Sequence, residues 1–463
     1  MELQLRISGH HYEELKKHLF PGDGKEAIAI ALCGRYSDET SEILLVHELT
    51  LIPYDECSVR EPDLLQWSTR SIQHYFEKIG STTFALLKIH SHPNDYNNFS
   101  KTDDMSDYDF FDSAFGWASN NKPHASAIML PSGEIFGRFF FEDLHHEPIN
   151  KVMIVSDIIY QFTTSKKRCI DGFALRTIQA FGEQTYEYLR KMRIGVVGCS
   201  GTGSLVVEQL ARLGVGQLLL IDPDTIENKN LNRILNAFST DVNDNVPKVV
   251  VLAKAIEKMG LETVVETHQV NLYDSIKALK ALAKCDFIFG CVDSIDGRHL
   301  LNQLASFYIL PYFDLGVKLE ANGQGGINKI CGTVNYIQPS KSSLITRSLY
   351  DMEDLRASSQ YRKNPEEFEL LRKNAYIKNI NVERPAVISV NMQIASHAIN
   401  EFLNRIHPFK GENPSYYAAS TIDITEGCII NAEESSFMED VYLKNKVGRG
   451  DMTPFIEMSE LIL

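Results

Sequence analysis

Two histidines, a serine and an aspartate in the N-terminal part of the chain have the types and spacing to bind a metal ion. His90 and His92 are separated by one residue, Ser100 follows eight residues after His92, and Asp103 follows three residues later. Two imidazoles and a carboxylate with one open position are typical of catalytic zinc. Such a metal makes a coordinated water more acidic, and Ser100 would donate a hydrogen bond to a developing oxyanion.

The elements around these residues explain how the side chains would meet. Residues 84–89 form an apolar, strand-like run that His90 and His92 continue. Residues at i and i+2 of a strand point to the same face of a sheet. Asp103 begins an expected helix over 103–115, where an aspartate is a favourable cap. We therefore expect the strand to supply two nitrogen ligands and the helix one oxygen ligand.

The pattern H-x-H-x7-S-x2-D resembles that of the JAMM metalloproteases. The resemblance implies an α+β zinc hydrolase domain over residues 1–156 that cleaves bonds next to ubiquitin-like proteins. JAMM enzymes use a glutamate at the start of an early strand as general base, and residues 24–34 resemble that strand, so Glu26 is the candidate base. Its spacing is one residue longer than in many family members, and Glu48 and Glu56 remain alternatives.

Length, charge and composition limit the number of domains, the partners and the location that we expect. The chain has 463 residues, enough for two or three domains, and a net charge of -15, which argues against nucleic acid as the main partner. No apolar run reaches the length of a membrane span, and the N-terminus lacks the features of a signal peptide. The eight cysteines show no disulfide-like framework. We therefore expect a cytoplasmic protein without a membrane partner.

Hydrophobic patterns divide the chain into two parts. In the first part, helices are expected at 12–20 and 62–79 and strands at 27–32, 43–52, 125–130 and 135–141. In the second part, strand-like runs at 193–198, 217–222, 263–270 and 286–291 alternate with helical stretches. This alternation predicts a Rossmann-like α/β domain with a mostly parallel sheet. We expect a connector at 157–172 and this domain at 173–463, with an irregular C-terminal tail.

A glycine-rich turn joins the first strand of the second part to its helix. Gly198, Gly201 and Gly203 lie in this turn. Glycines there permit a tight turn and close approach of a phosphate, and the helix N-terminus adds free amides and positive potential. A dehydrogenase would carry a similar turn, so the segments that follow decide. These segments are Asp222-Pro-Asp224, Glu227-Asn-Lys-Asn230-Leu-Asn-Arg233, Val246-Pro-Lys248 and Gly290-Cys-Val-Asp293.

Together these segments resemble the ThiF/MoeB adenylation family, which includes the adenylation domains of ubiquitin-activating enzymes, over about residues 170–405. The resemblance implies ATP and Mg²⁺ as cofactors. It also implies roles for individual residues: Asp222 and Asp224 at the ribose and magnesium, Asn230, Arg233 and Lys248 at the phosphates, and Asp293 orienting Mg-ATP. Attack of a carboxylate on the α-phosphate builds negative charge, which arginine, lysine and Mg²⁺ stabilise.

Arg176 lies in a segment, residues 176–182, that resembles the family's arginine segment before this domain. In the family that arginine commonly reaches the partner subunit's active site, so the resemblance implies a homodimer formed through the adenylation domain.

Missing thiols separate this chain from many relatives. Residues 340–346 contain serines and a threonine where relatives often carry the first C-x-x-C pair of a structural zinc, and no cysteine lies between Cys331 and Cys428 to form a thioester. We therefore expect no structural zinc. The adenylate would pass to the thiol of a partner such as a conjugating enzyme, to a hydroxyl in 340–346, or into an amide or sulfur transfer.

The two motif sets predict a bifunctional enzyme. A zinc (iso)peptidase would process or deconjugate a ubiquitin-like or sulfur-carrier protein, and the second site would adenylate the C-terminal glycine of that protein, as in prokaryotic conjugation pathways that include defence. One alternative is adenylation of a peptide or small molecule in a biosynthetic pathway with an associated peptidase. Another is a non-catalytic scaffold.

Overall fold

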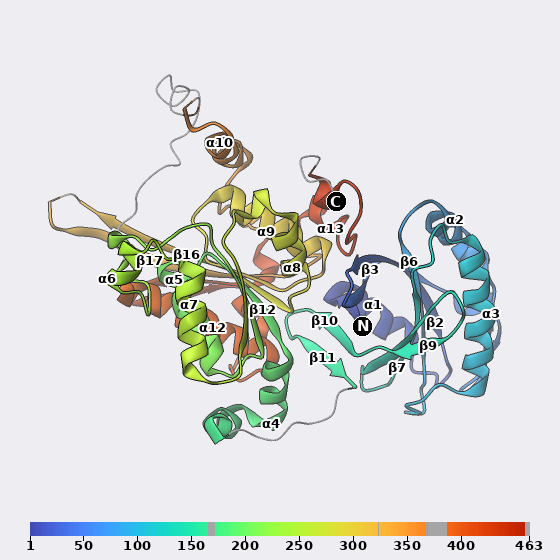
Figure 1. The fold of residues 1–463 in the computed structure, drawn as a ribbon. Coiled ribbons are helices and arrows are strands. Elements are labelled where there is room, and N and C mark those ends of the chain that lie inside the picture. Colours follow the sequence, from blue (N-terminus) through green and yellow to red (C-terminus); the bar gives the residue numbers. More distant parts are fainter. Residues whose placement is uncertain (165–171, 323, 367, 369–386, 459–463) are drawn as a thin grey trace. The chain divides into compact units, whose positions relative to one another are not determined.

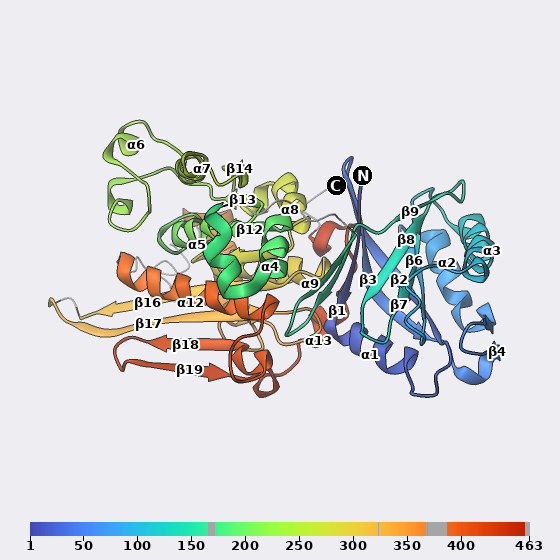
Figure 2. The same cartoon turned by 90° about the horizontal axis from the view of Figure 1, so that it is seen from below.

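The chain folds into two compact units, each built around one large sheet (Figure 1, Figure 2). The structure is a computed structural model that describes residues 1–164, 172–322, 324–366, 368 and 387–458. The first unit comprises Met1–Lys166, Ser306–Ile309 and Asn445–Leu463, and the second comprises Lys167–Ala305 and Leu310–Lys444. Residues 165–171, which make up much of the expected connector 157–172, lie outside the described residues.

A nine-stranded mixed sheet forms the first unit, in the order β11-β10-β1-β3-β2-β6-β7-β8-β9. Its strands are β1 (Glu2–Ser8), β2 (Ile28–Ser37), β3 (Ser41–Leu51), β6 (Ala85–Ser91), β7 (His124–Met129), β8 (Ile135–Phe140), β9 (His146–Pro148), β10 (Lys151–Val155) and β11 (Tyr160–Thr163). In its centre β2 runs antiparallel to both β3 and β6, and β6 runs parallel to β7.

Helices cover both faces of this sheet. The helix α1 (Gly9–Leu19) packs with buried side chains of one face, and α2 (Gln73–Ser81) and α3 (Lys101–Trp117) pack with those of the other face. Side chains alternate along a strand, and Leu86 of β6 belongs to the face under α2 and α3. His90 of β6 therefore points to the same face as Leu86, towards α3.

The helix expected at residues 62–79 is wrong in its first half. Leu65–Trp67 forms β5, which pairs with β4 (Cys57–Arg60) in a small hairpin, and α2 begins at Gln73 after a short 3-10 turn. The pairing of β5 with β4 overrides the helical period of this segment. The strand β1 was not expected, although it is buried between β10 and β3.

The second unit contains an eight-stranded sheet in the order β14-β13-β12-β15-β16-β17-β18-β19. Its strands are β12 (Arg193–Val197), β13 (Gln217–Ile221), β14 (Val264–His268), β15 (Phe287–Gly290), β16 (Tyr312–Ala321), β17 (Ile327–Ile337), β18 (Ala419–Asp423) and β19 (Cys428–Ala432). The pairs from β14 to β16 are parallel, and those from β16 to β19 are antiparallel. The expectation of a Rossmann-like, mostly parallel α/β sheet is confirmed.

The helices α5 (Gly201–Arg212), α6 (Ser239–Asn243), α7 (Lys248–Met259), α8 (Ile276–Ala283) and α9 (Ile295–Phe307) lie between the parallel strands of the second unit. The helix α4 (Leu175–Lys191) precedes β12, α10 (Met352–Lys363) and α12 (Ile388–Ile406) lie between β17 and β18, and α13 (Val441–Lys444) follows β19. The helix α12 packs against α5, the helix that follows the glycine-rich turn.

Residues 445–458, which we call the C-terminal strap, belong to the first unit. The Gly34 N–H donates to Gly448 O at 3.1 Å, and the Asp451 N–H donates to Arg35 O at 2.7 Å. A Cβ on Gly34 would lie 2.1 Å from Gly448 O, so a glycine is required for this approach. The sequence grouped these residues with the second domain, whereas the structure places them against β2, a long-range contact that no local pattern encodes.

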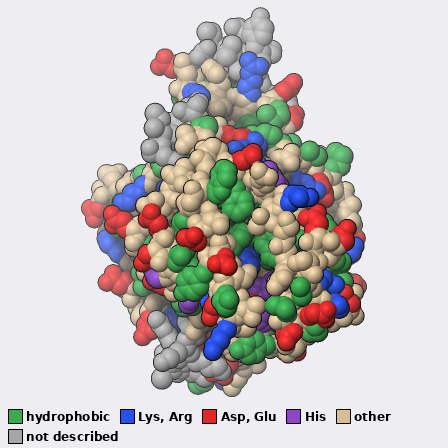
Figure 3. Space-filling view, turned by 90° about the vertical axis from the view of Figure 1, so that its right-hand side faces the viewer, with side chains coloured by type: hydrophobic (Ala, Val, Ile, Leu, Met, Phe, Trp, Pro, Cys, Tyr) green, Lys and Arg blue, Asp and Glu red, His purple; other side chains and the backbone are tan. Residues whose placement is uncertain are grey.

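Charged and hydrophobic side chains are mixed on the surface of the protein that Figure 3 shows. No helix in the described part of the chain has the length and apolar character needed to cross a membrane. Figure 3 shows acidic, basic and hydrophobic side chains interspersed over one face.

Candidate functional site

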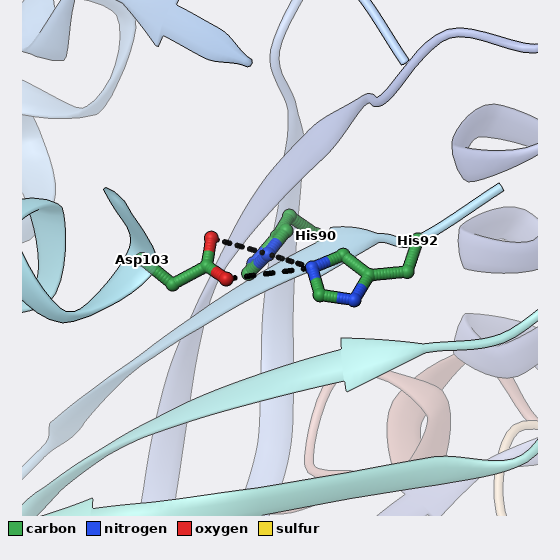
Figure 4. Close-up of side chains that lie close together, drawn as sticks. All are labelled: His90, His92 and Asp103. Carbon is green, nitrogen blue, oxygen red and sulfur yellow. Dashed lines mark hydrogen bonds and ion pairs between the residues drawn. The ribbon is translucent and has the colours of Figure 1, made fainter. Parts of the chain in front are cut away.

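His90, His92 and Asp103 bring three potential metal ligands together in the first unit (Figure 4). The Nε2 atoms of His90 and His92 are 3.2 Å apart. Asp103 Oδ1 lies 3.1 Å from His90 Nε2, and Asp103 Oδ2 lies 3.5 Å from His92 Nε2. Tetrahedral ligands about 2.1 Å from zinc are separated by about 3.4 Å. The three side chains therefore have the spacing that a single zinc ion requires.

A capping box at the start of α3 orients the aspartate. The Ser100 hydroxyl accepts a hydrogen bond from the Asp103 N–H at 3.1 Å, and Asp103 Oδ2 accepts one from the Ser100 N–H at 2.6 Å. This reciprocal pair satisfies two backbone donors at the helix N-terminus. It also turns the Asp103 carboxylate towards the histidines and leaves the Ser100 O–H as a donor.

The hydrogen bonds and protonation states of His90, His92 and Asp103 favour binding of a cation. His92 Nδ1 donates to Tyr96 O at 2.6 Å, which leaves the lone pair on Nε2, the atom that faces the other ligands. Burial lowers the pKa of His90 and so favours its neutral form. Burial opposes ionisation of Asp103, but its contacts with the two histidines and the hydrogen bond from the Ser100 N–H outweigh it and hold the pKa of that carboxyl well below its usual range.

Glu26 lies beside the ligands. Its Oε1 is 3.9 Å from His92 Nε2, and the side chain is almost fully buried. Burial raises the pKa of Glu26 to about 7 against the opposing charge of His92. A carboxyl that titrates near neutrality suits a general base. Glu48 instead forms an ion pair with Lys78 at 2.6 Å, and Glu56 is exposed. Of the three candidates Glu26 lies beside His92, and its role as the base stays a prediction.

The nucleotide-site residues of the second unit follow the carboxyl ends of three adjacent parallel strands. Gly198 follows β12, Asp222 follows β13, and Asp293 lies three residues after β15. Since β12 pairs with both β13 and β15 in parallel, these residues share one edge of the sheet. This edge is where ligands bind in open α/β sheets.

The turn after β12 requires its glycines. Gly198 has a φ of 88°, and a Cβ on Gly203 would lie 1.8 Å from Gly198 O. The first turn of α5 can therefore approach the end of β12 closely, with its free amides at the sheet edge. A Cβ on Gly201 would lie 3.0 Å from Arg233 Cδ, so the side chain of Arg233 passes over this helix start.

Two carboxylates and a lysine converge after β13. Asp222 Oδ2 accepts from the Cys199 N–H at 2.7 Å, and Asp222 Oδ1 accepts from the Asp224 N–H at 2.9 Å. Lys248 Nζ lies 2.6 Å from Asp224 Oδ2 and 3.7 Å from Asp222 Oδ1. Burial raises the pKa of Asp222 against the opposing charge of Lys248. The sequence-predicted trio is thus brought together at the start of α7.

Asn230 and Arg176 have different surroundings. Asn230 is buried, and its Oδ1 accepts from the Glu227 N–H at 3.0 Å, which shapes the segment that carries Arg233. Arg176 lies on α4, and its Nη1 donates to Gln179 Oε1 at 3.2 Å on the same exposed helix surface. The reach of Arg176 into a partner subunit stays a prediction.

The cysteines and the segment 340–346 restrict the options for transfer after adenylation. Cys199 and Cys331 are buried, and Cys428 is exposed on β19. The Ser342 hydroxyl is buried and accepts from Arg347 Nε at 2.8 Å. Arg347 also forms an ion pair with Glu434 at 2.8 Å. Ser342 is therefore part of a buried structural cluster, which disfavours it as an ester-forming hydroxyl.

Sequence reasoning missed several residues at both sites. The Asn391 amide of α12 contacts Thr202 Oγ1 at 2.8 Å in the glycine-rich turn, across 189 positions of sequence that offer no local signal. Lys88 and Asp107 form a buried ion pair at 2.8 Å on the strand and the helix that carry His90 and Asp103. A signal for Lys88 existed, because a lysine inside the apolar run 84–89 needs a buried partner.

A family model described as ThiF family matches residues 174–423, more than half of the chain. The chain belongs to the ThiF family. Ubiquitin-like modifier-activating enzyme 5 from Drosophila mojavensis is 28% identical over 169 residues, which cover 34% of this chain and 40% of that protein. The same enzyme from Culex quinquefasciatus is 27% identical over 181 residues, covering 36% and 43%. The chain thus spans about two fifths of the length of these curated relatives.

Solved structures that resemble this ThiF-family chain have a lower sequence identity to it than the curated relatives. The microcin C7 biosynthetic enzyme MccB in complex with N-formylated MccA has a TM-score of 0.46 and 18% identity, covering 58% of this chain and 74% of that one. E. coli MccB with ATP has a TM-score of 0.43 and 18% identity, covering 59% and 74%. Likenesses at this level carry no argument about substrate.

Proposed function

We propose that the second unit uses ATP to adenylate the C-terminus of a small protein or peptide. The observation that carries the proposal is the convergence, at one sheet edge of a ThiF-family domain, of the glycine-rich turn, Asp222, Lys248 and Arg233. The amides of the turn face the space that phosphates occupy in such folds. Arg233 and Lys248 would stabilise negative charge that develops on the α-phosphate. Asp222, Asp224 and Asp293 would hold the ribose and Mg²⁺, which would supply further positive charge.

The relatives and the cysteines support this substrate class. The curated relatives are ubiquitin-like modifier-activating enzymes, which favours a ubiquitin-like protein. Cys199 and Cys331 are buried, and the exposed Cys428 lies beyond the segment in which a thioester cysteine is expected. This arrangement favours direct transfer from the adenylate rather than a thioester on this chain, which suits a peptide substrate equally. The acceptor would be a partner's thiol or an amine.

ATP–pyrophosphate exchange tests the adenylation. We expect exchange that depends on a small protein or peptide with a Gly-Gly end and that is lost in Arg233→Ala. Arg212→Ala is the matched control, because Arg212 lies exposed on α5 and pairs with Glu208. Mass spectrometry of the adduct distinguishes a protein from a short peptide. Absence of exchange with every candidate, in wild type and control alike, would reject the proposal.

For the first unit we propose a zinc-dependent peptidase that acts on the same C-terminus. The specific observation is the triangle of His90, His92 and Asp103. Zinc held there would act as a Lewis acid towards a scissile carbonyl. Glu26 would take a proton from the water that attacks the carbonyl and return it to the departing amine, and Ser100 would donate a hydrogen bond to the oxyanion. The JAMM-like resemblance of the motif supports this assignment.

Elemental analysis tests the metal. We expect about one zinc per chain in wild type and a loss of most of it in His90→Ala, as for removal of one of three protein ligands. His10→Ala is the control, because His10 is an exposed histidine of the same unit. A zinc-free wild type would leave the first unit as a scaffold without metal chemistry.

A further inference from the structure

A buried cluster of charged side chains lies beside the metal ligands. Lys88, Asp107 and Arg138 are all almost fully buried. Lys88 Nζ lies 2.8 Å from Asp107 Oδ1, and Arg138 Nη2 lies 2.7 Å from Asp107 Oδ2. Arg138 Nη1 also contacts Asp104 Oδ1 at 2.6 Å. These contacts join β6, α3 and β8, three elements that are separate in sequence.

Lys88 and Asp107 lie on the same faces of β6 and α3 as His90 and Asp103. Lys88 precedes His90 by two residues on β6, so both side chains point to the face of the sheet that α3 covers. Asp107 follows Asp103 by four residues, one helical turn along the same face of α3. The Lys88–Asp107 ion pair therefore joins the strand and helix that carry the ligands, one turn away from the metal site.

The remaining contacts fix the helix from a second direction. Arg138 Nε and Nη2 lie 3.2 and 2.7 Å from Asp107 Oδ2, and the guanidinium lies 3.8 Å from the centre of the Phe99 ring. Phe99 directly precedes the Ser100 cap of α3. Arg138 thus contacts α3 at its start and at its second turn, which restrains both sliding and rotation of the helix.

Burying such a cluster costs free energy of desolvation unless every charge in it has a partner. Each buried charge must be paired and hydrogen-bonded, and removing one member leaves another without compensation. Asp107 accepts from Lys88 and from Arg138, so both of its oxygens are paired. A cluster of this kind stabilises one arrangement of the helix on the sheet rather than a range of arrangements.

We propose that Lys88, Asp107 and Arg138 are positioning residues that set the distance between Asp103 and the two histidines and thereby set the affinity for zinc. The inference rests on the proposed zinc site of the first unit. The three residues do not touch the metal. They act through α3, whose displacement would move Asp103 out of the triangle.

Zinc affinity, measured by competition with a chelating indicator, tests the role. Asp107→Asn keeps the shape of the side chain but removes its charge, and we expect zinc binding about 10- to 100-fold weaker, as for loss of outer-shell support. Glu42→Gln is the matched control. It disrupts a buried Arg35–Glu42 pair of 2.9 Å in the same unit, contributed by β2 and β3 rather than α3. Both variants should unfold at lower temperature, whereas Asp107→Asn alone should weaken zinc binding.

A second variant covers the case in which Asp107→Asn does not fold. Arg138→Lys keeps a cation but loses the forked contact to Asp104 and Asp107, and it should also weaken zinc binding. Equal zinc affinity in these variants and in Glu42→Gln would overturn the positioning role while the zinc site stands. A wild type that binds no zinc would instead reject the zinc site and this inference with it.

Discussion

At the residue scale, Glu26 is the candidate general base of the proposed zinc site. Its pKa is raised to about 7 by burial, although it lies near His92. In Glu26→Gln we expect kcat to fall by about 10²- to 10⁴-fold on any peptide that wild type cleaves, because the base is lost. Zinc content should stay at the wild-type level. Glu48→Gln is the control, and an equal loss of activity there would contradict the assignment.

His124 makes the first unit sensitive to acid. It is fully buried, its Nδ1 accepts the Leu86 N–H at 2.9 Å, and burial lowers its pKa well below 6.5. The unfolded chain therefore binds a proton before the folded one. The stabilisation from neutral His124 is complete above a pH of about 6.5 and is lost as the pH falls towards the folded-state pKa.

Calorimetry at a series of pH values tests this effect. We expect the thermal midpoint of the first unit to fall between about pH 7 and about pH 5, and His124→Asn, which keeps an acceptor, to show a smaller fall. Burial also lowers the pKa of His47, which therefore acts in the same direction, so the test compares the slopes of the thermal midpoint against pH in the two proteins. The same slope in wild type and His124→Asn would show that His124 is not the source.

The spacing of residue types predicted correctly which side chains lie together when those residues belong to one helix or strand. His90 and His92 share a strand face, and Asp103 lies at a helix start, so local periodicity was sufficient. Glu26 reaches His92 because β2 pairs with β6, with Ile28 opposite His90. That pairing spans about sixty residues of sequence, which is why Glu48 and Glu56 could not be set aside beforehand.

At the element scale, the start of α3 combines a helix cap with the proposed oxyanion donor, Ser100. Ser100→Ala removes the acceptor for the Asp103 N–H, which costs about 1 kcal/mol of stability. It also removes the proposed oxyanion donor, so kcat should fall by about 10²- to 10³-fold. Ser100→Thr keeps the hydroxyl and should restore both. Thermal unfolding and peptidase assays measure the two effects, and a Thr variant as inactive as Ala would contradict the donor role.

The turn into α5 requires a glycine at position 203. In Gly203→Ala the added Cβ would lie 1.8 Å from Gly198 O, so the backbone must shift. We expect loss of ATP binding by isothermal calorimetry and a lower thermal midpoint of the second unit. Gly116→Ala is the control, because no atom lies within 4 Å of its added Cβ and it sits in a helix. Unchanged ATP binding in Gly203→Ala would place the nucleotide elsewhere.

Periodicity predicted the elements of the second unit better than those of the first. The strands β12, β13 and β15 are buried parallel strands with short apolar runs, which are recognisable one by one. In the first unit, β1 and the hairpin β4–β5 owe their state to partners distant in sequence. The short segment Leu65–Trp67 became a strand through its pairing with β4, although its spacing indicated a helix.

At the scale of the whole molecule, the C-terminal strap completes the first unit. It pairs with β2 through Gly448, Gly450 and Asp451, and the Asp451 carboxylate accepts from the Ser37 N–H at 3.1 Å. Deleting residues 445–463 should lower the thermal midpoint of the first unit and release its zinc, because buried backbone groups lose their partners. ATP–pyrophosphate exchange by the second unit should persist. Retained zinc in the deletion variant would contradict this account.

The strap also has a consequence for the order of events during synthesis. Residues 445–458 emerge from the ribosome after all of the second unit, yet they complete the unit that begins at the N-terminus. The first unit therefore matures last, although most of it is translated first. In terms of the proposed functions, a newly made molecule would acquire the ability to activate a C-terminus before the ability to cleave one.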